Sequence, residues 1–276
     1  MRLARSAAAL AVFLLAAACA DQSPTASPRD GGASRIVNGT YAGNSYPNVG
    51  ALLVDFDGNH VLNGNDEDCT GSLISPTVFL TAAHCVEFLP ANAQLYVSFS
   101  PDLYASKIGV IAATGFRFDP LYGHDTANEH DLAVVFLPAS ATKGITPLKL
   151  PPAGYLDALG AQNGLKDVVF VNVGYGVSAS RTGVPSFGYD GRRNVSKSPF
   201  MSLRPYWLVL KMNTAATGEG GDCYGDSGGP KFMDGNTSMI FATVTSGDTN
   251  CRSTTVDYRL DTDSARGFLG QFVALP

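Results

Sequence analysis

The sequence predicts an all-β protein made of two β-barrels and a C-terminal α-helix. Among its 276 residues are 30 Gly, 15 Phe and 11 Tyr, which suits a turn-rich β protein better than a helical bundle. Short apolar runs bounded by Gly, Pro, Asn and Asp form two groups along the chain. A single amphipathic helical pattern follows the second group. These three observations together define the fold class.

The first element is expected to be an export signal, covering residues 1–19. Arg2 and Arg5 precede an apolar run of 12 residues, from Ala7 to Ala18. Such a run is too short to span a bilayer as a helix and is typical of a secretory signal. We therefore expect a secreted protein, in which disulfides can form.

Cys19 leaves two interpretations open. The stretch from Leu15 to Cys19 resembles the lipobox of bacterial lipoproteins, in which the Cys is lipidated. In that case Cys19 attaches the chain to a membrane, in the periplasm or cell envelope. The alternative is an ordinary signal that is cleaved further downstream, which removes Cys19. Residues 20–35 are rich in Pro, Gly and small polar residues and are expected to be a tether or pro-segment.

The remaining chain is expected to fold as one barrel over about 36–140 and a second over about 150–262. The first group of strands is predicted at 50–56, 69–74, 78–81, 94–99, 107–118 and 131–137. The second group is predicted at 167–175, 206–212, 229–233, 239–245 and 255–260. Residues 139–161 contain three Pro and directly follow Pro138, and they are expected to be a connection.

The final element is a predicted helix over 264–275. Its apolar face is formed by residues at helical spacing: Ala265, Phe268, Leu269, Phe272 and Val273. Asp263 or Ser264 is expected to cap its N-terminus.

Charge and cysteine content exclude several classes of protein. The net charge of −5 argues against a nucleic-acid binder. Without Cys19, four of the five Cys remain, an even number that allows three disulfide pairings. No C-x-x-C spacing occurs, so we expect two disulfides and no metal site.

The segment GDSGGP, from Gly225 to Pro230, is the most informative for chemistry. Glycines beside Ser227 let backbone N–H groups approach a substrate carbonyl closely. An α/β-hydrolase needs its His after the Ser, whereas all four His precede Ser227 here, which excludes that fold. His84 follows a predicted strand in TAAHC, and Asp131 begins the apolar run DLAVV. The order His, Asp, Ser is one known solution to the catalytic triad.

These three motifs together resemble the chymotrypsin/trypsin family of serine endopeptidases, over residues 36–276. The segments RIVNG, PLKLP and VGYG, beginning at Arg35, Pro147 and Val173, agree with the resemblance. The resemblance implies two antiparallel six-stranded barrels with the active site between them. It also implies a peptide or protein substrate, no cofactor and a monomer.

The roles of individual residues follow from the resemblance. Ser227 would be the nucleophile, His84 the general base and acid, and Asp131 the residue that orients His84. The N–H groups of Gly225 and Ser227 would form the oxyanion hole. The implied disulfides are Cys69–Cys85 and Cys223–Cys251. The remaining histidines, His60, His124 and His130, are expected to be bystanders.

The segment around Arg35 resembles the activation site of the family. Cleavage after Arg35 would free the ammonium of Ile36, which would pair with Asp226, so the chain would be a zymogen. The alternative is that backbone donors satisfy Asp226 and that the preceding residues are only a tether.

Substrate preference is less well defined. Gly221 stands where trypsin-like members carry the Asp that binds Lys or Arg. Asp222 is either a negative charge in the pocket wall or a rim carboxylate facing solvent. The far wall is expected to include Thr245 and Gly247, and Val256 would narrow the pocket toward small aliphatic side chains. The Thr245 hydroxyl is also expected to support Asp131.

Two other functions compete with proteolysis. The chain could be a catalytically silent, protease-like binding protein, although none of the triad residues is missing. It could also be an esterase, since the acyl-transfer chemistry of the triad does not exclude esters.

Overall fold

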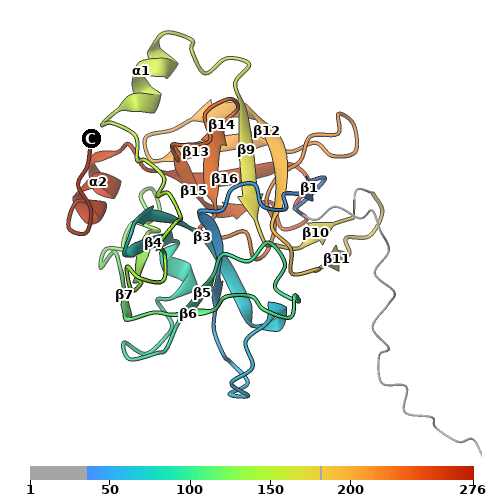
Figure 1. The fold of residues 1–276 in the computed structure, drawn as a ribbon. Helices are drawn as coiled ribbons and strands as arrows, with labels where there is room; N and C mark the ends of the chain where they lie inside the picture. Colours follow the sequence, from blue (N-terminus) through green and yellow to red (C-terminus); the bar gives the residue numbers. More distant parts are fainter. Residues whose placement is uncertain (1–35, 181) are drawn as a thin grey trace, which may run out of the picture. The chain divides into compact units, whose positions relative to one another are not determined.

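The computed structural model describes residues 36–180 and 182–276. These residues form two seven-stranded antiparallel sheets and a small hairpin, β10 (Ser178–Ala179) with β11 (Phe187–Gly188) (Figure 1). The expected signal peptide, Cys19, the tether and Arg35 lie outside the described residues. No helix of the described part of the chain is long and apolar enough to cross a membrane.

The first sheet is built from residues 49–136. Its strands are β2 (Val49–Leu53), β3 (Glu67–Ser75), β4 (Val78–Thr81), β5 (Tyr96–Ser98), β6 (Ile111–Ala112), β7 (Gly115–Phe118) and β8 (Ala133–Phe136). Their order is β6-β5-β2-β3-β4-β8-β7. The predicted strand 107–118 is thus two short strands, because Ala113 and Thr114 separate β6 from β7. This bent segment pairs with β5 at one end and β8 at the other, so six runs of chain form the barrel.

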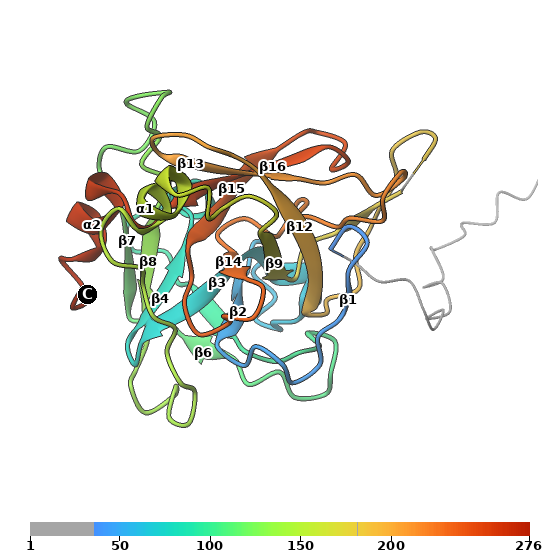
Figure 2. The same cartoon turned by 90° about the horizontal axis from the view of Figure 1, so that it is seen from above.

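The second sheet closes on itself. Its strands are β9 (Val169–Gly174), β12 (Asn194–Leu203), β13 (Trp207–Lys211), β14 (Pro230–Met233), β15 (Ala242–Gly247) and β16 (Thr254–Arg259). They form a ring because β12 also pairs with β9. The seventh strand, β1 (Thr40–Tyr41), lies along β12 (Figure 2). The start of the predicted first barrel therefore contributes to the second sheet.

Two elements of more than three residues were not predicted from the sequence. One is β12, which is ten residues long and contains Pro199. The other is helix α1 (Tyr155–Ala161), which lies within the stretch expected to be a connection. Leu156 is the buried residue of α1, and its N–H donates to Asp261 Oδ2 at 2.7 Å. The stretch expected to be a connection thus contains a short helix.

The C-terminal helix α2 (Asp263–Leu269) is shorter than predicted. Its N-cap is Thr262, whose Oγ1 accepts a hydrogen bond from Ala265 N at 3.3 Å, rather than Asp263 or Ser264. The Ser264 hydroxyl instead bonds the Tyr258 hydroxyl at 2.8 Å. Phe272 still packs against the core beyond the end of the helix, which explains the longer apolar pattern.

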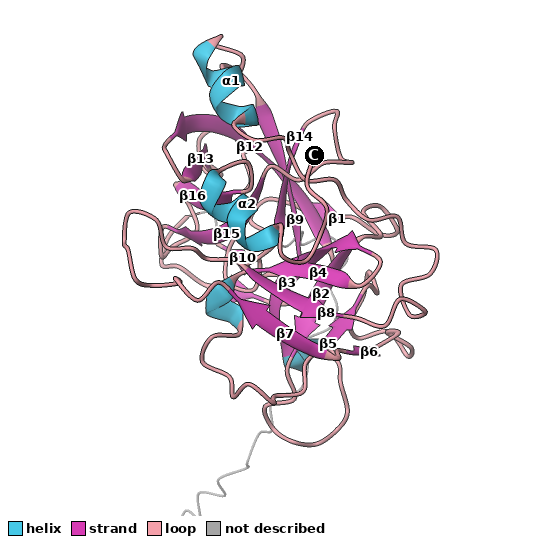
Figure 3. Ribbon diagram, turned by 90° about the vertical axis from the view of Figure 1, so that its left-hand side faces the viewer, coloured by secondary structure: helices cyan, strands magenta, loops and turns pink. Residues whose placement is uncertain are grey.

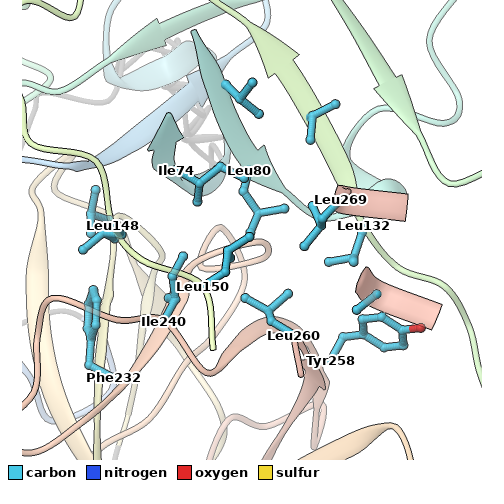
Figure 4. Packing of buried hydrophobic residues seen from close by; sticks show 14 of the residues in the cluster. Ile74, Leu80, Leu132, Leu148, Leu150, Phe232, Ile240, Tyr258, Leu260 and Leu269 are labelled. Carbon is cyan, nitrogen blue, oxygen red and sulfur yellow. The ribbon is translucent and has the colours of Figure 1, made fainter. Parts of the chain in front are cut away.

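A large apolar cluster joins the two sheets and α2. It contains Leu80 of β4 and Leu132 just before β8, Phe232 of β14 and Leu260 just after β16, and Leu269 of α2 (Figure 4). Figure 3 shows α2 beside both groups of strands. Because both sheets contribute side chains to this one cluster, they pack directly against each other.

Candidate active site

His84 lies in a short 3₁₀ turn, Ala83–Cys85, directly after β4. Ala83 and Cys85 are buried on either side of it, whereas the His84 side chain is 29% exposed. The disulfide Cys69–Cys85 ties this turn to β3. The local fold thus leaves the His84 ring as the accessible group of an otherwise buried turn.

Asp131 lies two residues before β8, the strand that pairs with β4, and its side chain is fully buried. Asp131 Oδ2 lies 2.9 Å from His84 Nδ1, and Oδ1 accepts a hydrogen bond from His84 N at 3.0 Å. With Nδ1 donating to this carboxylate, Nε2 of the neutral ring is free to accept a proton.

The environment of His84 changes its pKa in two opposing ways. Burial disfavours the imidazolium, whereas the hydrogen bond and charge of Asp131 stabilise it, as do the charges of Asp68 and Glu129. The stabilising effects prevail, so the pKa of His84 is raised above its usual value.

Ser227 lies in a tight turn that requires glycine. Gly228 has a φ of +75°, and a Cβ there would lie 2.2 Å from Thr81 Oγ1 and 2.6 Å from Ala82 N. Only glycine lets this turn approach the segment before His84 so closely. The Ser227 carbonyl also accepts from Thr70 N at 2.9 Å, which joins the turn to the first sheet.

His84 and Ser227 line the same cavity, which has a volume of about 490 Å³. Within the described residues, the Ser227 hydroxyl forms no hydrogen bond with His84. Such contacts are often long in unliganded enzymes and shorten when substrate binds. The cavity therefore presents a hydroxyl and an oriented imidazole to one ligand.

Gly225 also lines this cavity, at a φ of +92°. Its carbonyl accepts from Thr70 Oγ1 at 2.9 Å, which fixes the orientation of the turn. In the described part of the chain, the N–H groups of Gly225 and Ser227 donate to no backbone carbonyl. Both donors remain available to a ligand oxygen.

Asp226 is fully buried beside this turn. Its two oxygens accept from Gly176 N and Cys223 N, both at 2.9 Å, so the backbone donors of the alternative interpretation are present. Burial is the main cause that raises the pKa of Asp226, to about 8, and the charge of Asp222 adds to it. Ile36 is fully buried, and Val37 next to it pairs with Gly221.

The residues expected in the specificity pocket occupy different places. Asp222, Thr245 and Gly247 line the cavity, but Gly221 and Val256 are not among its lining residues. Gly221 pairs with Val37, and Val256 is a β16 residue opposite Val209. Gly221 and Val256 thus lie outside the lining of the cavity.

The structure decides between the two alternatives for Asp222 and contradicts the role expected of Thr245. Asp222 is only 6% exposed, so it is not a rim carboxylate facing solvent. It forms an ion pair with Lys231, a fully buried residue of β14. Thr245 Oγ1 has no hydrogen-bond partner within the described residues, so it does not support Asp131. The sequence analysis did not predict a role for Lys231. Its position in an otherwise apolar strand could have indicated a buried charge with a partner.

The second disulfide, Cys223–Cys251, braces the wall of the cavity, which both cysteines line. Away from the cavity, His130 lies 3.0 Å from Asp119 and His60 lies 3.2 Å from Asp55, so both histidines have carboxylate partners. His124 is exposed.

One group of carboxylates could hold a cation. Asp55, Asp57 and Asp66 each offer an oxygen within 4.8 Å of the others. These residues lie between β2 and β3 and do not line the catalytic cavity.

Comparison with known proteins identifies the family. Residues 55–265, more than half of the chain, match the family model described as Trypsin. The chain belongs to the trypsin family. The fold agrees: the solved structure of HL collagenase superimposes with a TM-score of 0.60 over 86% of this chain and 97% of that chain, at 19% identity.

Three proteins of known name have sequences similar to this chain. Brachyurin from Leptuca pugilator is 32% identical over 74% of this chain and 84% of its own length. Glucanase inhibitor protein 4 from Phytophthora infestans is 31% identical over 60% of this chain and 62% of its own length. Coagulation factor XII from Bos taurus is 32% identical over 39% of this chain and 16% of its own length.

Proposed function

We propose that this trypsin-family chain is a secreted bacterial serine endopeptidase. The observation that carries the proposal is the pair of hydrogen bonds from His84 to the buried Asp131, beside Ser227 in one cavity. A buried carboxylate on Nδ1 fixes the tautomer that leaves Nε2 free to act as a base. Ser227 is the nearby hydroxyl that such a base would activate.

In the proposed reaction, His84 takes the proton of Ser227 as the hydroxyl oxygen attacks the scissile carbonyl. The N–H groups of Gly225 and Ser227 stabilise the oxyanion. His84 then protonates the leaving amine, and an acyl-enzyme remains on Ser227. Water attacks this ester by the reverse sequence of proton transfers and releases the acid.

We also propose that cleavage after Arg35 activates the chain. The freed ammonium of Ile36 would pair with Asp226, a fully buried carboxylate that forms no ion pair with the described residues. Two observations support this. Ile36 is already fully buried, and it holds a φ of 58°, which is unfavourable for a β-branched residue. Cutting the peptide bond before Ile36 would release that strain.

The test compares protein that begins at Ile36 with its Ser227→Ala variant on a peptide library. Peptide cleavage is expected for the first, with a loss of about 10⁴-fold or more in the variant. An equally active variant would reject the assignment of Ser227. Including a lipid ester in the same assay separates a peptidase from an esterase.

The alternative function is that of a silent binding protein. It is favoured by one relative, whose name describes a glucanase inhibitor. A fluorophosphonate probe distinguishes the two, because only an activated serine reacts with it. Labelling that requires Ser227 supports the enzyme. Folded protein beginning at Ile36 that neither reacts nor cleaves peptides would support the binding protein.

A further inference from the structure

A buried cluster of one lysine and two aspartates lies behind the substrate cavity. Lys231 Nζ contacts Asp222 Oδ2 and lies 3.5 Å from Asp257 Oδ1. The side chains of Lys231 and Asp257 are fully buried, and that of Asp222 is 3% exposed. No part of this cluster is needed for the proton transfers of the proposed reaction.

The two aspartates differ in their relation to the cavity. Asp222 lines it, next to Cys223, whereas Asp257 is not a lining residue. Asp257 lies in β16, and both of its oxygens accept hydrogen bonds from Thr255 Oγ1, at 2.9 and 2.8 Å. Asp222 therefore lies at the cavity wall, whereas Asp257 lies behind it.

The charges within the cluster balance closely. Burial raises the pKa of Asp257 to about 7, although Lys231 opposes this shift. Burial thus disfavours a second negative charge at Asp257, and the ammonium of Lys231 balances the carboxylate of Asp222. Lys231 therefore compensates the negative charge of Asp222 on the cavity wall.

We infer that Lys231 is a specificity-determining residue that neutralises Asp222, so that the cavity selects an uncharged substrate side chain. A substrate ammonium or guanidinium entering the cavity would lose its hydration and meet Asp222 with its charge already compensated. It would also be repelled by Lys231 behind it. The inference rests on the proposed endopeptidase function and adds the substrate class to it.

Two double variants test this inference with the same change in composition. Lys231→Met with Asp257→Asn leaves Asp222 as the remaining carboxylate of the cluster. Lys231→Met with Asp222→Asn leaves Asp257 instead. Each removes one lysine and one acidic side chain, so the two variants match in composition, but only the first leaves an unpaired carboxylate on the cavity wall.

The first readout is binding of benzamidine, measured by calorimetry on protein beginning at Ile36 with Ser227→Ala. It does not depend on catalysis, so a failure of the proposed function would not hide the result. We expect the variant that retains Asp222 to bind benzamidine about ten- to hundredfold more tightly than the parent, as a charge-assisted hydrogen bond provides. The variant that retains Asp257 is expected to bind like the parent.

The second readout is the ratio of kcat/KM for peptides with Arg or Leu before the cleaved bond, measured with Ser227 intact. The parent is expected to prefer Leu, and the variant that retains Asp222 to shift toward Arg. An equal shift in both double variants, or a parent that already prefers Arg, would overturn the inference.

The single variant Asp222→Asn keeps the test decisive if the double variants do not fold. It leaves Lys231 paired with Asp257, so the buried charge remains balanced. We expect its preference for Leu to be unchanged. A specific loss of cleavage after Arg would instead make Asp222 the working anion of the pocket and reject the inference.

Discussion

The residue-scale environment of His84 includes a carboxylate that sequence motifs do not reveal. Asp68 lines the cavity, and its charge helps to raise the pKa of His84. One of its oxygens is buried and has no hydrogen-bond partner within the described residues. Asp68 thus acts on His84 through space.

Replacing Asp68 with Asn is predicted to move the acid limb of the kcat/KM profile to lower pH. Loss of this charge destabilises the imidazolium, so the pKa of His84 falls and the neutral base persists at more acidic pH. The measurement is a pH–rate profile. Asp167→Asn, at an exposed site far along the chain, should leave the limb in place. An acid limb at the same or a higher pH in Asp68→Asn would contradict the prediction.

The sequence predicted some site residues far better than others. Short motifs identified His84 and Asp131, and the structure places them in hydrogen-bond contact. Lys231 could not be assigned a partner, because Asp222 and Asp257 come from different strands or turns and only the fold brings them together. Charge pairing across a barrel has no signature in local spacing.

At the scale of elements, the most regular patterns were predicted well and the irregular ones were not. The strands β4 and β9 carry dense apolar runs, which are evident in the sequence. In contrast, β12 has the sequence NVSKSPFMSL, with few β-branched residues. It forms a strand because it pairs with β9 and β13. Tertiary pairing there overrides local propensity.

The start of α2 provides a prediction at this scale. Thr262→Ala removes the hydroxyl that accepts from Ala265 N and is expected to lower the free energy of unfolding by about 1 kcal/mol. Urea denaturation of protein beginning at Ile36 measures this. Thr126→Ala, in an exposed loop, is the matched control and should change stability little. Equal stability of both variants would remove the capping role.

For the whole molecule, Arg193 ties the two sheets together. Its buried guanidinium donates to the carbonyls of Val49, in β2, and Phe99, just after β5 of the first sheet. It also donates to the Tyr175 hydroxyl, beyond β9 of the second sheet, and to the Gly43 carbonyl. With the shared apolar cluster, this makes independent unfolding of either sheet unfavourable.

Arg193→Met is therefore predicted to destabilise the chain by at least about 3 kcal/mol, because several buried acceptors lose their donor. Unfolding of the parent should be one transition, seen equally by circular dichroism and by the single tryptophan, Trp207 of β13. Two separated transitions in the parent, or a variant as stable as the parent, would contradict this account of the interface.

The pairing of Lys231 with Asp222 also bears on the time course of activation. A cavity that binds basic side chains poorly would not bind Arg35, so mature molecules would not cleave precursor molecules after Arg35. Active enzyme would then accumulate in proportion to the amount of a separate, arginine-cleaving protease, without a lag or a self-accelerating burst. The separate protease alone would then determine when the precursor is cleaved after Arg35 and at what rate.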